Sequence, residues 1–130
     1  MAADTRLIAI VDDEESVRKA LVRLFKAASF EARAFPSARS FLLEADRLRI
    51  GCIVLDLQMP EMNGLELQQQ LRAAHPGNTI PIVMITAHDE PGTRERCLAA
   101  GAAAYMRKPL ESKALIATVA ELARGTSPNG

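Results

Sequence analysis

The sequence is poor in the features that mark secreted, membrane-spanning and disulfide-bonded proteins. Its two cysteines, Cys52 and Cys97, each lie in an apolar run without the paired spacing of a disulfide or a metal site, so we expect two buried thiols. No apolar run approaches the length of a membrane span, and the short run Leu7–Val11 ends in aspartates rather than in a cleavage signal. These absences predict a cytoplasmic protein that makes no membrane contact.

The chain also lacks an excess of charge of either sign. Its 16 Lys and Arg residues balance 16 Asp and Glu residues, so the formal net charge is zero. A balanced chain has no electrostatic basis for binding nucleic acid directly. What is present, 130 residues of which 48% are hydrophobic, suffices for one compact domain with a single core.

Short apolar runs indicate where strands form. Leu7–Val11, Cys52–Leu55 and Ile82–Ile85 are continuous and rich in Ile and Val, which is typical of parallel strands buried on both faces. Glu31–Phe35 alternates polar and apolar residues and suits a half-exposed edge strand, and Ala103–Met106 is a weaker fifth candidate.

Helical patterns fill the gaps between these runs and follow the last one. The first and last helices carry apolar faces, formed by Val17, Leu21, Leu24 and Phe25 and by Leu115, Val119 and Leu122. Ser37 is predicted to cap the second helix, and Asn63 with Glu66 resembles a capping box at the start of the third. Pro91 is placed to begin the fourth helix and Gly101 to end it.

This alternation of strands and helices predicts the fold class. Five strands and five helices in turn form a (βα)₅ chain, which right-handed crossovers fold into a doubly wound, five-stranded parallel α/β sheet. We expect one domain over residues 1–124. Residues 125–130 are Gly, Thr, Ser, Pro and Asn with little to bury, and we interpret them as a tail or linker stub.

Carboxylate, hydroxyl and ammonium side chains lie at the ends of four of the predicted strands. They are Asp12-Asp13, Asp56, Thr86 and Lys108. Because ligands of open α/β sheets bind at the carboxyl ends of the strands, these side chains are expected to converge on one edge. Three carboxylates at close range repel one another unless a cation compensates, and Mg²⁺ suits few carboxylates together with phosphate oxygens. With an ammonium and a hydroxyl group added, the set suits phosphoryl transfer to a carboxylate.

The ordered set resembles a known family. With the stretches Ile10–Glu14 and Asp56–Gly64, the chain is similar, from about Leu7 to about Ala123, to the receiver domains of two-component response regulators. The shorter pieces Phe35–Ala38 and Thr86–His88 resemble the FixJ-type branch, whose members usually carry a C-terminal helix-turn-helix. The resemblance implies a flavodoxin-like strand order, 2-1-3-4-5.

The resemblance also implies a ligand set and a phosphodonor. Asp56 would accept a phosphoryl group from a phosphohistidine on a sensor histidine kinase. Asp13 would bind Mg²⁺ directly and Asp12 through water, with Asp56 and the backbone carbonyl of Gln58 as further ligands. Glu14 is interpreted as a solvated residue at a helix start that could tune the metal site from outside.

The remaining implied residues concern the phosphoryl group and the switch. Lys108 would pair with the phosphoryl oxygens, or with the acceptor aspartate before phosphorylation, and its peptide bond to Pro109 would be cis. Thr86 and Ala87 would bind the phosphoryl group, Thr86 by moving toward it, and Tyr105 would turn inward behind Thr86. The surface that changes, roughly residues 91–124, would be read by a partner or by a second protomer in a phosphorylation-dependent homodimer.

Three alternative functions make different demands on the sequence. A flavodoxin-like electron carrier would need a phosphate-cradling loop where this chain has Asp12 to Glu15, and the chain has no Trp and one Tyr to surround a flavin. A haloacid-dehalogenase-type hydrolase would place its two aspartates two residues apart, whereas Asp12 and Asp13 are adjacent and position 14 is Glu. The third is a receiver-like binding module that works without phosphorylation. We expect a signalling switch, not a turnover enzyme, with only self-limited phosphotransfer and autodephosphorylation.

Overall fold

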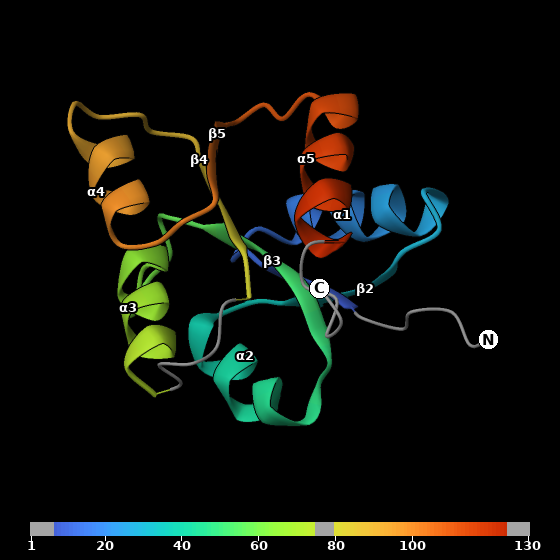
Figure 1. The fold of residues 1–130 in the computed structure, drawn as a ribbon, viewed down its shortest axis with the longest axis horizontal. Coiled ribbons are helices and arrows are strands. Elements are labelled where there is room, and N and C mark those ends of the chain that lie inside the picture. The colour runs from blue at the N-terminus through green and yellow to red at the C-terminus, as the bar shows by residue number, and fades with distance from the viewer. Residues whose placement is uncertain (1–6, 75–79, 125–130) are drawn as a thin grey trace.

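The structure is a computed structural model that describes residues 7–74 and 80–124. Within these residues, five parallel strands alternate with five α-helices and one short 3₁₀ helix (Figure 1). In chain order the elements are β1 (Leu7–Val11), α1 (Glu15–Ala27), β2 (Glu31–Phe35), α2 (Ala38–Glu44), η1 (Ala45–Arg47), β3 (Ile50–Asp56), α3 (Gly64–Ala74), β4 (Ile82–Thr86), α4 (Thr93–Ala99), β5 (Ala104–Arg107) and α5 (Ser112–Arg124). The predicted tail, 125–130, lies outside the described residues.

The strands form one sheet in the order β2-β1-β3-β4-β5, with every neighbouring pair parallel. The predicted doubly wound fold and its strand order are therefore confirmed. β3 occupies the middle of the sheet, and all of its residues are buried. β2 forms one edge and alternates between exposed and more buried residues, as its sequence pattern predicted.

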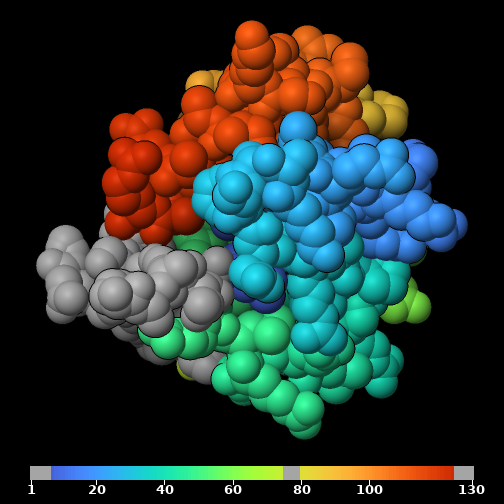
Figure 2. All heavy atoms as spheres, turned by 90° about the vertical axis from the view of Figure 1, so that its right-hand side faces the viewer, coloured from blue at the N-terminus to red at the C-terminus, as the bar shows by residue number. Residues whose placement is uncertain are grey.

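Helices cover both faces of the sheet. Leu21 and Phe25 of α1 share one buried cluster with Leu115 and Val119 of α5, so these two helices lie on the same face. α2, α3 and α4 contribute to the other cluster, on the opposite face. Figure 2 shows α1 and β2, in blue to cyan, next to α5, in red. The two clusters make the layered core that fixes the positions of the strand ends.

The predicted helix caps are confirmed. The hydroxyl of Ser37 accepts a hydrogen bond from the backbone N–H of Ser40 at 3.0 Å. At the start of α3, the side chain of Asn63 accepts from the N–H of Glu66, and the side chain of Glu66 accepts from the N–H of Asn63. These bonds satisfy N–H groups that the first helical turn leaves without partners.

Some predicted boundaries shift by a few residues. β3 begins two residues before the expected Cys52, at Ile50. α4 begins at Thr93 rather than at Pro91, because Gly92 adopts a left-handed φ of +84° that cannot continue into a helical turn. Gly101, with a φ of +111°, follows the end of α4 as predicted.

Two further predictions concern the thiols and membrane segments. Cys52 and Cys97 are both buried and free, and burial raises the pKa of the Cys52 thiol to about 12. Within residues 7–74 and 80–124, no helix combines the length and the apolar character needed to cross a bilayer.

In the part of the chain that the structure describes, Gln68 is the buried polar side chain without a hydrogen-bond partner. Gln68 of α3 is fully buried, and both polar atoms of its carboxamide lack a hydrogen-bond partner among the described residues. Its amide nitrogen lies near Gly101, at the turn between α4 and β5. An unsatisfied buried amide costs stability, so the contact of α3 with this turn is less favourable than an apolar one.

Candidate functional site

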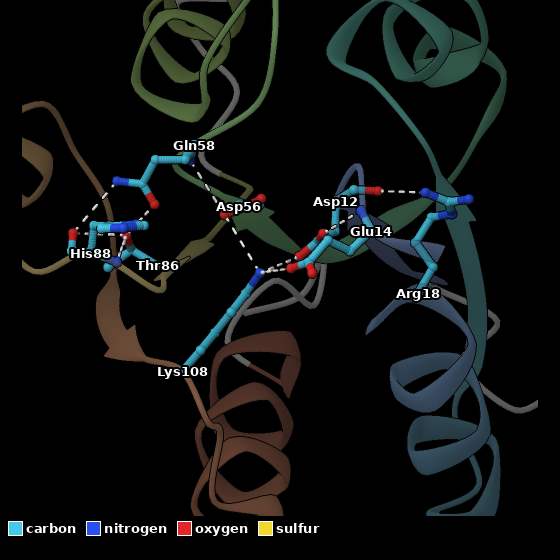
Figure 3. Close-up of polar contacts among 8 residues, drawn as sticks. All are labelled: Asp12, Glu14, Arg18, Asp56, Gln58, Thr86, His88 and Lys108. Carbon is cyan, nitrogen blue, oxygen red and sulfur yellow. Dashed lines mark hydrogen bonds and ion pairs between the residues drawn. The ribbon is translucent and has the colours of Figure 1, made fainter. Parts of the chain in front are cut away.

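Three carboxylates converge at the carboxyl edge of the sheet, as the strand-end pattern predicted. Figure 3 shows two of them, Asp12 and Asp56, with the side chain of Lys108 directed toward both. Asp12 and Asp13 follow β1, and Asp56 ends the neighbouring strand β3. One oxygen from each lies within 4.8 Å of the others. Asp12 is fully buried and Asp56 is 3% exposed, whereas Asp13 faces solvent.

Lys108 follows the carboxyl end of β5, and its side chain extends to this cluster. Its Nζ lies 2.9 Å from Oδ2 of Asp12, 3.3 Å from Oε1 of Glu14 and 3.7 Å from Oδ1 of Asp56. The ion pair with Asp56 expected from the sequence exists, but Asp12 is the nearer partner. Glu14 was expected to be solvated, and its exposed side chain nevertheless contacts the ammonium group. The peptide bond between Lys108 and Pro109 is cis.

The orientation of Asp12 is fixed by its neighbours. Its Oδ1 accepts a hydrogen bond from the backbone N–H of Glu14 at 2.8 Å, which leaves Oδ2 for Lys108. The guanidinium group of Arg18 donates to the backbone carbonyl of Asp12 at 2.9 Å, and the N–H of Asp12 donates to the carbonyl of Phe35. The backbone at the end of β1 is therefore held from both α1 and β2.

Burial, together with nearby negative charge, changes the titration of Asp56. Burial, followed by the nearby Asp12 carboxylate, raises its pKa from 3.8 to about 7, although Lys108 and the backbone N–H of Gln58 oppose the shift. Burial by itself lowers the pKa of Lys108, but bonds to Asp12 and the charge of Asp56 outweigh it and raise that pKa overall. A cation placed among the carboxylates would therefore favour the ionised form of Asp56.

The backbone behind Asp56 leaves no room for a larger residue at position 64. A Cβ on Gly64 would lie 2.5 Å from the carbonyl oxygen of Asp56 and 2.9 Å from Sδ of Met84. The N–H of Gly64 donates to the carbonyl of Leu57 at 2.9 Å and closes the turn after β3. The sequence contained this glycine within a motif, but only the structure assigns it a packing reason.

Thr86 lies at the same edge, at the end of β4, and is fully buried. Its hydroxyl lies 2.5 Å from Oε1 of Gln58 and 3.0 Å from the carbonyl oxygen of His88, and it accepts from the N–H of His88 at 3.0 Å. Figure 3 shows the Gln58 side chain bridging toward Thr86 and His88. The backbone N–H of Gln58 donates to Oδ1 of Asp56 at 3.3 Å, so Gln58 connects the two strand ends. Ala87, next along the chain, is exposed.

Tyr105 lies on β5, and it is buried. Its hydroxyl donates to Oδ1 of Asp89 at 2.9 Å. Neither Asp89 nor the side-chain contact of Gln58 with Thr86 was expected from the sequence. The sequence offers no periodic signal for these residues, because they lie in loops whose side-chain directions depend on the folded neighbours.

The donor set fits Mg²⁺. The close oxygens all belong to carboxylates, at least two of them on buried residues, and oxygen ligands are the ones that Mg²⁺ prefers. Burial and the neighbouring Asp12 carboxylate raise the pKa of Asp56, and a bound cation would oppose both effects. The described residues therefore provide a suitable site for a hard divalent cation.

Comparison with known proteins gives the family. The family model described as "Response regulator receiver domain" matches residues 8–120. This chain belongs to the response regulator receiver domain family. The predicted resemblance is thus confirmed, and membership argues against the electron carrier and the hydrolase.

Curated relatives of this receiver domain include regulators of the predicted branch. TodT of Pseudomonas putida, a response regulator protein, is 34% identical over 119 residues, which are 92% of this chain and 52% of TodT. FixJ of Rhizobium meliloti, a transcriptional regulatory protein, is 36% identical over 110 residues, which are 85% of this chain and 53% of FixJ. The chain spans about half the length of these relatives.

Solved structures place the receiver domain in the same fold. FixJ-N matches with a TM-score of 0.83 at 33% identity, covering 94% of this chain and 96% of FixJ-N. The chemotaxis protein CheY4 of Vibrio cholerae matches with a TM-score of 0.84 at 26% identity, covering 92% of this chain and 99% of CheY4.

Proposed function

We propose that this receiver domain is a Mg²⁺-dependent phosphoacceptor switch and that Asp56 is its acceptor. The observation that carries the proposal is the position of Asp56, 3% exposed at the end of the central strand, with Asp12 and Asp13 on one side and Lys108 at 3.7 Å. The donor would be a phosphohistidine on a sensor histidine kinase in the cytoplasm.

Each residue of the site has a part in the transfer. An oxygen of ionised Asp56 attacks phosphorus, the phosphorus–nitrogen bond of phosphohistidine breaks, and the electron pair returns to the imidazole. Asp12, Asp13, Asp56 and the backbone carbonyl of Gln58 would hold Mg²⁺, which when bound supplies positive charge beside the phosphoryl oxygens. Lys108 would supply a second positive charge to those oxygens, and the N–H of Ala87 a hydrogen bond.

The switch would act through Thr86 and Tyr105. A phosphoryl group on Asp56 adds charge and acceptor oxygens, which would draw the Thr86 hydroxyl away from Gln58. The surface formed by residues 91–124 would then change and be read by an effector domain or by a second receiver domain in a homodimer. The output would be transcriptional, as the name of FixJ indicates for that relative. Hydrolysis of the aspartyl phosphate by the domain itself would limit the signal.

The test is an intact-mass measurement after incubation with Mg²⁺ and acetyl phosphate. The parent is expected to gain one phosphoryl group, and Asp56→Asn is expected to gain none. Asp46→Asn is the matched control, because Asp46 lies in η1, before the amino end of β3 and thus at the opposite edge of the sheet. Addition to Asp46→Asn but not to Asp56→Asn would assign the acceptor.

Fast hydrolysis could hide the adduct, so beryllofluoride binding is measured in parallel. Beryllofluoride mimics a phosphoryl group on a carboxylate and does not turn over. If the parent neither gains mass nor binds beryllofluoride, the phosphoacceptor proposal is wrong. Partner binding that survives Asp56→Asn would then establish the phosphorylation-independent binding module.

A further inference from the structure

Tyr105 is held in its buried position by a carboxylate of another element. Its side chain is 7% exposed, and its hydroxyl donates to Oδ1 of Asp89 at 2.9 Å. Asp89 belongs to the loop between β4 and α4, which follows Thr86 directly. A charge-assisted hydrogen bond of this kind is stronger than one between neutral groups.

Charged groups from each neighbouring segment face this hydrogen bond. Nε of Arg107, on β5, lies 3.8 Å from Oδ2 of Asp89, and the guanidinium carbon of Arg94, on α4, lies 6.0 Å from the ring centre of Tyr105. Burial, followed by the bond to Asp89, raises the pKa of Tyr105 to about 12, with a smaller contribution from Cys97. The phenol therefore stays protonated and remains a donor to Asp89 at neutral pH.

The same loop forms hydrogen bonds with Thr86. The hydroxyl of Thr86 contacts both backbone groups of His88, accepting from the N–H at 3.0 Å and lying 3.0 Å from the carbonyl oxygen. Asp89 is joined to His88 by one peptide bond. A hydroxyl has a single hydrogen to donate, so Thr86 cannot bond to a phosphoryl oxygen on Asp56 and keep donating to Gln58 or His88. Rotation of the Thr86 side chain toward Asp56 therefore breaks hydrogen bonds to the backbone of His88, which is joined directly to Asp89.

We propose that Asp89 is a positioning residue of the switch, whose carboxylate holds the hydroxyl of Tyr105 and couples the position of Tyr105 to that of Thr86 through the backbone of His88. This inference rests on the proposed function of Asp56 and extends it to the residue that links the acceptor edge to β5. The contact between Asp89 and Tyr105 stabilises the arrangement in which Thr86 is bonded to Gln58 and His88. Weakening that contact therefore lowers the free-energy cost of moving Thr86 toward a phosphoryl group on Asp56.

The sequence supplies a specific optical probe for this contact. Tyr105 is the one tyrosine of the chain, and there is no tryptophan, so tyrosine fluorescence reports on this side chain alone. A phenol that donates to a carboxylate fluoresces weakly, because the excited hydroxyl passes its proton to the acceptor. Asp89→Asn removes the charge and is expected to brighten the emission. Glu90→Gln, which removes a carboxylate from the next position of the same loop, is expected to leave it unchanged.

Beryllofluoride affinity, measured with Mg²⁺ present, tests the coupling itself. We expect Asp89→Ala to bind beryllofluoride about 10- to 100-fold more tightly than the parent, as the loss of one hydrogen bond to a charged group implies. Asp89→Asn is expected to lie between them, because its amide oxygen still accepts. Tyr105→Phe is expected to match Asp89→Ala, and the double variant Asp89→Ala/Tyr105→Phe is expected to gain nothing further.

The outcomes separate this inference from the proposed function. If the parent does not bind beryllofluoride, the acceptor site itself is refuted. If the parent and Asp89→Ala bind it equally, or if the effects of Asp89→Ala and Tyr105→Phe simply add, the acceptor site stands and the coupling is refuted. Equal emission from the parent and Asp89→Asn, with circular dichroism unchanged, would refute the contact on which the coupling depends.

Discussion

The ammonium group of Lys108 lies nearer to Asp12 than to Asp56. Nζ is 2.9 Å from Oδ2 of Asp12 and 3.7 Å from Oδ1 of Asp56. The lysine is therefore the nearer partner of the fully buried Asp12, and burial followed by the Asp12 charge raises the pKa of Asp56 to about 7 although Lys108 opposes the shift. The ionised form of such a carboxylate is stabilised by a cation or by a group that masks its negative charge.

The raised pKa of Asp56 predicts a pH-dependent stability in the presence of a chelator. Between about pH 4 and pH 7 the folded protein retains a proton that the unfolded chain has released, so stability falls as pH rises through this window. Each unit of pKa difference corresponds to about 1.4 kcal/mol. Asp56→Asn has no such titration and is expected to be the more stable protein at pH 8 but not at pH 4, in urea unfolding.

Magnesium provides the control for that prediction. At pH 8, adding Mg²⁺ is expected to raise the melting temperature of the parent, because the ion binds the folded state and compensates the carboxylates. The rise is expected to be much smaller in Asp56→Asn, which lacks one of the proposed carboxylate ligands. Equal rises in both proteins would mean that Asp56 does not take part in the metal site.

Replacing Lys108 is expected to separate two effects of its charge. In Lys108→Met without metal, the buried Asp12 loses its partner, and the free energy of unfolding is expected to fall by about 3 kcal/mol. Mg²⁺ is expected to bind this variant more tightly than the parent, because the cation no longer competes with an ammonium group. Melting temperatures over a Mg²⁺ series measure both, and weaker Mg²⁺ binding would contradict the prediction.

Gly64→Ala is expected to destabilise the fold by about 3 kcal/mol, since its Cβ would lie 2.5 Å from the backbone oxygen of Asp56. Gly92→Ala offers the comparison, because Gly92 has a φ of +84° but a Cβ added there would meet only Arg96 Nη1, at 3.6 Å. That change is expected to cost only about 1–2 kcal/mol of backbone strain. Urea unfolding of both variants decides, and equal costs would mean that the backbone at position 64 moves aside easily.

Gln68→Met is expected to stabilise the protein by about 1 kcal/mol. Methionine has nearly the same shape, and it removes two buried polar atoms that have no partner among the described residues. Gln69→Met at the neighbouring exposed position is the matched control and is expected to change little. A loss of stability in Gln68→Met, with Gln69→Met neutral, would point to a polar function for this amide.

The sequence was sufficient to predict the architecture and the meeting point of the site. Continuous apolar runs, such as that ending at Asp56, identify strands buried on both faces, and parallel strands bring their carboxyl ends to one edge. Local rules also worked at helix starts, where Ser37 bonds to the N–H three residues further on. Both kinds of inference depend on spacing along the chain, which a sequence displays directly.

Spacing along the chain does not predict which of several nearby side chains a residue contacts in the folded protein. Lys108 has three carboxylates within 4.0 Å, and distances of a few tenths of an ångström decide that Asp12 is nearest. The contact of Asp89 with Tyr105 joins a loop to a strand 16 residues away. Gln68 is fully buried although glutamine is mostly exposed in folded proteins, so its residue type alone does not indicate its position.

The place of β3 in the sheet has a consequence for hydrogen exchange. Its backbone is paired on both sides, with β1 and β4, whereas β5 is an edge strand next to the short helix α4. Amide protons near Asp56 should therefore exchange only through global opening, and those of α4 and β5 through small local openings. The proposed acceptor therefore lies where the backbone is expected to open least, and the segment that would report its modification lies where native substates are expected to interconvert more readily. A signal would thus arise by redistributing substates at the edge, while the centre of the sheet stays closed.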